Sequence, residues 1–150
     1  MKKLTLFCAL VCFILSCKSK KQPDTIVILK SNEVEIIKSN RAYSLGKRLL
    51  EACSSSRFKP FTIKEATEKV IKNATPERIS ETCKKINFRN GKFIALELID
   101  ISLNKTTDQF IFRYNIVFEK KVNQRQLTVI VDADNRVSSI STKEIDTKPF

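Results

Sequence analysis

The sequence predicts a single α+β domain in which three helices pack on one face of a four-stranded antiparallel β-meander. Three observations support this prediction. Apolar residues recur at helical spacing between residues 32 and 90, they alternate with polar residues from residue 93 onward, and short polar segments join the alternating runs. The length of 150 residues fits one such domain with a short appendage.

The first 16 residues have the pattern of a secretory signal peptide. Two lysines follow Met1, and residues 4–15 carry no charge. This run is too short for a membrane-spanning helix, which needs about 20 apolar residues. The alternative is a buried N-terminal helix of the domain, which the lack of a polar face disfavours.

The leader ends in Ile14-Leu15-Ser16-Cys17, which resembles the lipobox of bacterial lipoproteins. The resemblance implies a diacylglyceryl thioether on Cys17, cleavage before it and acylation of the freed amine. Two or more acyl chains anchor a protein stably, at about 0.8 kcal/mol per buried CH₂. The alternative is an ordinary secreted protein cut near Ser16. We therefore expect a signal peptide over 1–16 and a protein that is lipid-anchored in the cell envelope.

Residues 17–31 are expected to be the lipidated cysteine and a flexible tether. Three lysines lie at positions 18–21, and each would add about 1 kcal/mol of attraction to anionic headgroups. No acidic tag follows Cys17, which favours the periplasm-facing side of the outer membrane. The apolar run at 26–29 fits either an edge strand or the approach to a helix, and the sequence does not decide between them.

The domain is expected over residues 32–150, and its first helix starts near Asn32. Asn32 with Glu35 forms a plausible cap pair, and the serines at 54–56 end the helix. Gly46 lowers the local helix preference by about 1 kcal/mol relative to Ala, which allows a break there. The apolar stripe consists of Val34, Ile37, Ala42, Leu45, Leu49 and Cys53.

Two short helices follow, each with a start signal. Thr62 with Glu65 forms a capping box that leads into the second helix. Thr75 is an N-cap residue, and Pro76 occupies the first position of the third helix. Residues 90–91, Asn-Gly, mark a tight turn.

Four strands are predicted after this turn. They cover about 93–103, 110–119, 126–131 and 136–145, and the joins lie at 104–107, 122–125 and 132–135. Because the joins are short and polar, the strands form an antiparallel meander. The second strand has an aromatic and β-branched face, which the helices are expected to cover. This face consists of Phe110, Phe112, Tyr114, Ile116 and Phe118.

The order of three helices, a turn and long antiparallel strands resembles the cystatin-like cone of the nuclear-transport-factor and ketosteroid-isomerase superfamily. More narrowly, it resembles small lipoprotein domains of unknown function from bacterial envelopes. The resemblance covers roughly residues 33–145 and is carried by 47–50, 75–77, 91–93 and 129–137. It implies a curved sheet around a concavity. Members range from isomerases and hydratases to plain binding modules, so the fold does not name a function.

The chain contains no His, which excludes every mechanism that needs imidazole as acid, base or ligand. Cys53 and Cys83 are the thiols of the mature domain, and an oxidising periplasm permits a disulfide between them. Closing a loop of about 30 residues would stabilise the fold by about 3–4 kcal/mol. The other interpretation, which we favour, is two separate buried thiols on their helix stripes.

No cofactor or metal site is predicted. Two thiols without His leave too few soft ligands for zinc. Asp132-Ala133-Asp134-Asn135 begins like a calcium loop, but Val137 and Lys143 stand where that loop needs Gly and Glu. We interpret this segment as a hairpin turn.

Glu97 and Asp100 are the only candidate bases, because they lie among apolar residues of the first long strand. A carboxylate in an apolar pocket has a raised pKa and can accept a proton. Such residues more often face solvent, so we name no catalytic residue and expect a binding or interaction module. The alternative is a small pocket enzyme of the isomerase or hydratase type that uses one of these carboxylates.

The chain is basic, with 28 Lys and Arg against 16 Asp and Glu and a net charge of +12. Basic spots lie at Lys84-Lys85, at Lys120-Lys121 and at Arg125. They are either a solvated surface or sites that attract an acidic envelope polymer or an acidic envelope protein. No nucleic-acid-binding motif is present, so nucleic acid is not an expected partner.

Overall fold

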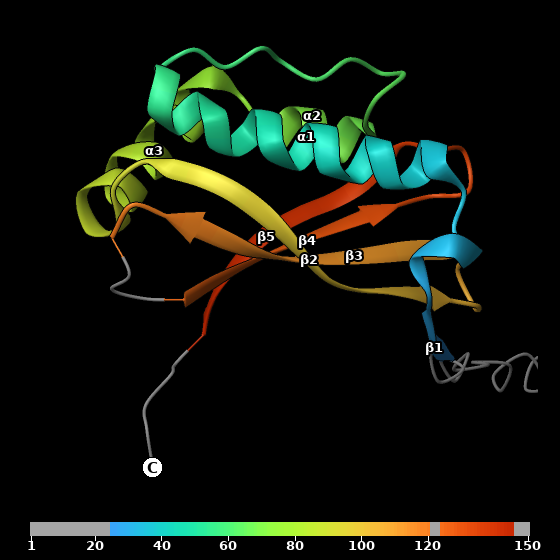
Figure 1. The fold of residues 1–150 in the computed structure, drawn as a ribbon. Helices are drawn as coiled ribbons and strands as arrows, with labels where there is room; N and C mark the ends of the chain where they lie inside the picture. The colour runs from blue at the N-terminus through green and yellow to red at the C-terminus, as the bar shows by residue number, and fades with distance from the viewer. Residues whose placement is uncertain (1–24, 121–123, 146–150) are drawn as a thin grey trace, which may run out of the picture.

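The computed structural model describes residues 25–120 and 124–145, which form one antiparallel sheet with three helices. The strands lie in chain order and are β1 (Ile26–Leu29), β2 (Phe93–Asn104), β3 (Gln109–Phe118), β4 (Gln124–Val131) and β5 (Val137–Ile145). The helices are α1 (Ile36–Ser55), α2 (Glu68–Asn73) and α3 (Pro76–Asn90). The α+β class is confirmed, because the helices precede the four long strands and α1 lies across one face of the sheet (Figure 1).

The sheet has five strands, so the prediction of four was wrong. β1 pairs antiparallel with the last four residues of β2, and Leu29 lies opposite Ile101. A run of four apolar residues carries too little periodicity to identify a strand, and the uncovered edge of β2 supplies the partner that decides it. The sheet therefore begins inside the segment that was expected to be tether. The leader, Cys17 and the lysines at 18–21 lie outside the described residues.

The start of α1 also differs from the prediction. Residues 31–33 form one 3₁₀ turn, in which the Glu33 carboxylate accepts a 2.6 Å hydrogen bond from the backbone N–H of Lys30. This turn takes the place of the Asn32–Glu35 cap, and α1 begins four residues after Asn32 without a side-chain cap. The predicted end is confirmed, because Ser56 caps the helix in the left-handed conformation with φ 56°.

α1 does not break at Gly46, which is buried against β4. A Cβ atom at this position would lie 2.6 Å from Cδ2 of Leu127. The missing side chain therefore allows the helix to approach the sheet closely, and this packing outweighs the lower helix preference of Gly.

Thr62 and Glu65 form the hydrogen bond expected of a capping box, but no helix starts there. The Glu65 carboxylate accepts a 2.9 Å hydrogen bond from the backbone N–H of Thr62, which closes a single turn. The chain then extends to pair with β5 at Val137, so α2 begins only at Glu68. For α3 the prediction is confirmed, because Thr75 caps the helix and Pro76 begins it.

The aromatic face of β3 forms the core, as predicted. Phe112, Tyr114, Ile116 and Phe118 are all at most 5% exposed, and Phe110 is half-buried. They pack with buried residues of the other layers, such as Leu45 of α1 and Leu127 and Val129 of β4. Because side chains alternate along a strand, the neighbouring residues of β3 point to the uncovered face of the sheet.

Candidate functional site

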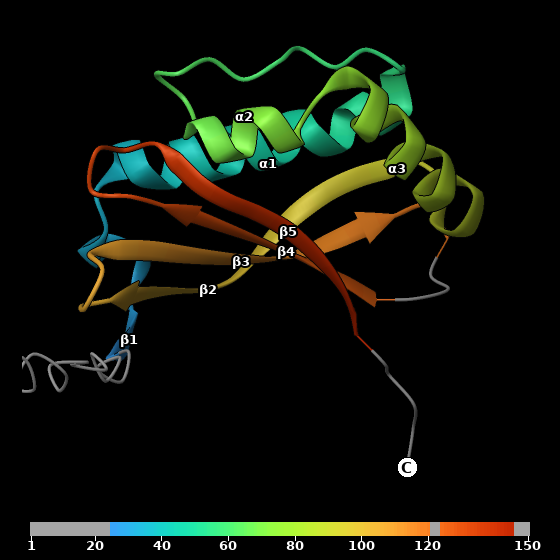
Figure 2. The same ribbon diagram turned by 180° about the vertical axis from the view of Figure 1, so that it is seen from behind.

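A cavity of about 240 Å³ lies where α1, α2 and α3 meet the edge strand β5. Figure 2 shows this side of the molecule, with β5 running below α2 and α3. Its lining is mostly apolar and includes Leu49, Leu50, Val70, Ile79, Ile86 and Ile140. A concave apolar site with a few polar groups is the usual form of a ligand-binding pocket.

Two backbone hydrogen bonds to β5 explain how α2 comes to lie beside the cavity. The backbone N–H of Val137 donates to the carbonyl oxygen of Glu65, and the N–H of Thr67 donates to the carbonyl oxygen of Val137, both at 2.9 Å. These two bonds fix the segment before α2 to the start of β5. The helix that follows then lies beside the strand and forms the second wall of the cavity.

A second contact fixes the same segment to α1. Two nitrogens of the Arg48 guanidinium donate to the Glu65 carboxylate at 2.6 and 3.2 Å, and Arg48 also lies 5.3 Å from the centre of the Phe61 ring. The hydrogen bond from Arg48 is the main cause that lowers the pKa of Glu65 from 4.5 to about 2, and the Thr62 N–H adds to it. The carboxylate is therefore charged at every physiological pH.

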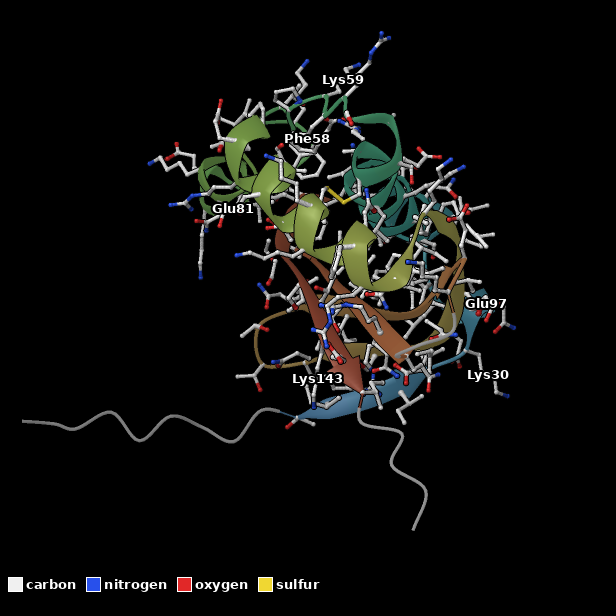
Figure 3. The ribbon with its side chains drawn as sticks, turned by 90° about the vertical axis from the view of Figure 1, so that its left-hand side faces the viewer. Lys30, Phe58, Lys59, Glu81, Glu97 and Lys143 are labelled. Atoms are coloured by element: carbon white, nitrogen blue, oxygen red, sulfur yellow. A yellow bond between two sulfur atoms is a disulfide. The ribbon has the colours of Figure 1, made fainter. Side chains whose placement is uncertain are left out.

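Cys53 of α1 and Cys83 of α3 form a disulfide, so our preference for two separate thiols was wrong. Their Cα atoms lie 4.7 Å apart, although 30 positions separate them in the chain. The apolar stripes of α1 and α3 face each other, which brings the two cysteines together. Figure 3 shows the disulfide as a yellow bond between these helices, and both cysteines line the cavity.

The polar groups of the cavity come from three elements. β5 contributes Ser138, Ser139, Ser141 and Thr142, and the helices contribute Lys69, Asn73 and Thr82. Lys69 is the only charged residue of the lining. The site can therefore surround an apolar group and offer hydroxyls, an amide and one cation to a polar or anionic end.

Two other hollows are present. One, of about 170 Å³, lies on the other side of the disulfide, where Cys53, Cys83 and Ile79 line it as well. The other, of about 360 Å³, lies between the start of α1 and strands β2 and β3, and no charged residue lines it. Tyr114 borders this third hollow, and burial raises the pKa of its phenol. Because neither hollow combines an apolar wall with hydroxyls along a strand, we take the first as the candidate site.

Glu97 and Asp100, the candidate bases, lie on β2 and do not line any of these three hollows. Asp100 accepts two hydrogen bonds from Arg113 at 2.8 and 2.6 Å, and this bonding raises the pKa of Arg113. Glu97 is exposed and accepts a 3.4 Å bond from Asn115. Figure 3 labels Glu97 on one side of the molecule and Glu81 of α3 on the other. Asp100 is thus engaged in an ion pair and Glu97 faces solvent, so neither carboxylate is enclosed among apolar residues of the described part of the chain.

The basic spots lie close to the end of α3. Lys84 and Lys85 are exposed on this helix, and the ammonium group of Lys120 lies 3.5 Å from the carbonyl oxygen of Phe88. Arg125 is half-buried instead, and it shares the carboxylate of Glu144 with Arg89. Lys121 lies outside the described residues. Folding therefore brings Lys120 close to the helix that carries Lys84 and Lys85, although the two spots are far apart in the chain.

The segment from Asp132 to Asn135 forms the predicted hairpin turn. The Asp132 carboxylate accepts a 2.8 Å hydrogen bond from the backbone N–H of Arg136, whose guanidinium also lies 3.0 Å from Asp134. Within residues 25–120 and 124–145, no group of three His, Cys, Asp or Glu side chains is placed to hold a metal ion. None of the helices in these ranges is long and apolar enough to cross a membrane.

Comparison of the chain with protein-family models, with curated proteins and with solved structures finds no match in any of the three. The site is therefore interpreted from its own geometry.

The sequence analysis missed most residues of the cavity. Lys69, Asn73, Thr82 and the serines of β5 belong to no motif, and each has a polar side chain at a position where a solvated surface is the ordinary expectation. A signal was present in β5, whose residues 138–142 carry no charge in a basic chain. An uncharged stretch of this length on an edge strand is unusual, because charges normally protect such edges from pairing.

Proposed function

We propose that this chain is a lipid-anchored protein of the cell envelope that faces the periplasm, and that its domain is a binding module. The observation that carries the binding role is the cavity between α1, α2, α3 and β5, which is apolar, lies at the surface and has one cation in its lining. We propose no reaction, because neither Glu97 nor Asp100 lies in an apolar pocket.

The envelope location rests on the sequence Ile14-Leu15-Ser16-Cys17. We propose that Cys17 carries the acyl chains, that residues 1–16 are removed and that the protein faces the periplasm from the outer membrane. The nine residue steps between Cys17 and Ile26 would hold the domain within about 30 Å of the membrane surface. A partner in the same envelope is then always near the cavity.

The partner we propose is an envelope protein or an acidic envelope polymer. Lys69 in the cavity and the cations at the end of α3 support it, because a positive surface attracts acidic groups. We also propose that the domain is a curved cystatin-like cone. The helices that precede the long strands and cover one face of their antiparallel sheet support this resemblance.

The anchor is tested by growing cells with a radioactive fatty acid. The wild-type protein should take up label, and Cys17→Ser should not. Cys12→Ser is the matched control, since it makes the same change at a cysteine of the leader that we propose is removed, and it should label like the wild type. Label on Cys17→Ser would overturn the lipid anchor.

The binding role is tested by blocking the cavity. Thr82 is exposed on α3 and lines the cavity, so Thr82→Trp should fill it without disturbing the core. The probe is 1-anilinonaphthalene-8-sulfonate, an aromatic anion whose fluorescence rises in apolar sites. We expect the wild type and Phe88→Trp, an exposed and uncharged control on the same helix outside the lining, to bind it and Thr82→Trp to lose binding. Equal binding by all three would contradict the proposal.

A further inference from the structure

We propose that an extended peptide, with acidic residues at its two ends, binds this cavity by adding a strand to the outer edge of β5. The inference rests on the proposed function, because it assigns a class of partner to the same cavity. Strand addition supplies affinity through backbone hydrogen bonds and specificity through pockets for alternate side chains.

The outer edge of β5 is open for pairing. β4 occupies the inner edge of β5 from Ile145 to Val137. On the outer edge, only Val137 pairs, in a parallel bridge with Ala66. Along Ser138–Ile145 no further backbone bond to the described residues is made on that side. The bridge at Ala66 therefore shows that this edge of β5 can pair with an extended segment. Within the described residues, that bridge covers only Val137, the first residue of the strand.

The cavity runs along this open edge. Side chains alternate between the two faces of a strand, so a pocket on one face is lined by every second residue. Here all five residues from Ser138 to Thr142 line the cavity. This is expected when the backbone edge of the strand, and not one of its faces, forms the wall. The opposite wall consists of α2 and α3, which leaves a groove between a strand and two helices (Figure 2).

The groove has a place for an apolar side chain of the added strand. A volume of about 240 Å³ equals the share of about eight water molecules in the liquid. Leu50, Val70 and Ile86 belong to its apolar lining. Replacing water there with an apolar side chain is favourable by about 25 cal/mol per Å² of apolar surface that becomes buried.

One cation in the groove and one beyond its far end favour an acidic peptide. Lys69 lies on α2 just beyond the bridge to Val137, and Lys143 follows the uncharged stretch of β5 (Figure 3). Neither lysine has a carboxylate partner among the described residues, whereas Glu68 contacts Lys72 at 3.5 Å and Glu144 contacts Arg125 at 3.2 Å. The five residues between the two cations span about 17 Å in a strand. Lys69 lines the cavity on the helix side, whereas Lys143 points to the uncovered face of the sheet, because its neighbour Thr142 lies opposite the buried Leu127. A bound strand that meets both cations would therefore carry one acidic residue at each end, and the two acidic side chains would point to opposite faces of the sheet.

The experiment uses the mature full-length chain in detergent micelles and a phage-displayed library of random nonapeptides. We expect the selected peptides to carry acidic residues around an apolar, β-branched centre. Replacing their acidic ends with Lys should weaken binding roughly tenfold, since two exposed ion pairs are lost. Binding should protect amides within 138–142 from hydrogen exchange.

Backbone methylation gives the signature of strand addition. N-methylation removes one N–H donor at a time, and in an added strand only every second N–H points to the partner edge. Methyl groups at alternate positions should therefore abolish binding, and those between them should be tolerated. Equal tolerance at all positions, or protection of amides outside β5, would overturn the proposal.

Protein variants locate the peptide. Thr82→Trp should lose binding, and Phe88→Trp, on the same helix but outside the lining, should keep it. Lys69→Glu should weaken binding of the acidic peptide, and Lys64→Glu, an exposed control outside the lining, should not. If the naphthalene probe binds and no peptide is selected above the Thr82→Trp background, strand addition is wrong and the binding role stands. If neither binds, both fail. A dimer that Thr82→Trp dissociates would also overturn the proposal, because a second copy would then be the occupant.

Discussion

The two edge regions of the sheet differ in how far their strands are protected from pairing with another chain. At one edge β1 covers Ile101–Asn104 of β2, and the remaining stretch of β2 is interrupted by two register shifts. This stretch also carries Glu97 and Asp100. At the other edge β5 has a single register shift at its start, and Ser138–Thr142 continue without a charge beside the cavity.

The comparison shows which edge lacks the usual protection against pairing with another chain. Bulges and charges are the usual means by which proteins keep an edge strand from pairing with another chain, and β2 has both. β5 has neither along the cavity, where α2 and α3 limit access to one extended segment. The two sides also differ in how they are held, because a disulfide and the partly buried Arg48–Glu65 ion pair fix the helices beside β5, whereas the Arg113–Asp100 pair of β2 is more exposed.

The largest expected effect comes from removing the disulfide beside β5. The double variant Cys53→Ala, Cys83→Ala should lose about 3–4 kcal/mol of unfolding free energy, because the unfolded chain is no longer closed into a loop of about 30 residues. Urea unfolding measures this loss. Hydrogen exchange should rise in α3 and stay unchanged in β2. Wild-type protein in reductant should unfold like the variant, and an unchanged midpoint in reductant would contradict the prediction.

The next effect concerns Glu65. Its pKa of about 2 in the folded protein lies below its ordinary 4.5, so it contributes stability above pH 4.5 that is lost as the pH falls towards 2. Glu65→Gln should cost on the order of 2 kcal/mol at pH 7 and flatten the loss of stability between pH 5 and pH 2. Thermal unfolding across this range measures it. Glu97→Gln, at the other edge, is the control and should keep the wild-type pH dependence.

A smaller effect is expected at the exposed ion pair of β2. Asp100→Asn should cost about 0.5–1 kcal/mol, because the Arg113 side chain is 46% exposed and water screens the pair. Chemical unfolding at low salt measures the difference, and 1 M salt should reduce it. A loss as large as that of Glu65→Gln would show that the two sides of the sheet are held equally.

The smallest effect is expected from Ile94→Lys. Ile94 is 59% exposed on the free stretch of β2, so the substitution should change stability by no more than about 0.5 kcal/mol. It should leave peptide binding at β5 unchanged. If Ile94→Lys abolished peptide selection, β2 and not β5 would be the pairing edge.

Much of the fold follows from short-range pattern. The alternation from Phe110 to Phe118 placed one side of β3 in the core, and Thr75 with Pro76 fixed the start of α3. These features depend on residues that are neighbours in the chain. The signal at Thr62 and Glu65 shows the limit, because its hydrogen bonds form while the next residues pair with β5 instead of continuing a helix.

The sequence by itself determined the α+β class, the faces of the long strands and the limits of α3, since side-chain period and capping act over a few residues. Only the tertiary structure decided that Ile26–Leu29 is a fifth strand, that Cys53 meets Cys83, and that α2, α3 and β5 enclose a cavity. Each of these depends on segments about 30 to 80 positions apart, and their meeting is set by how the helices pack on the sheet, which local patterns do not encode.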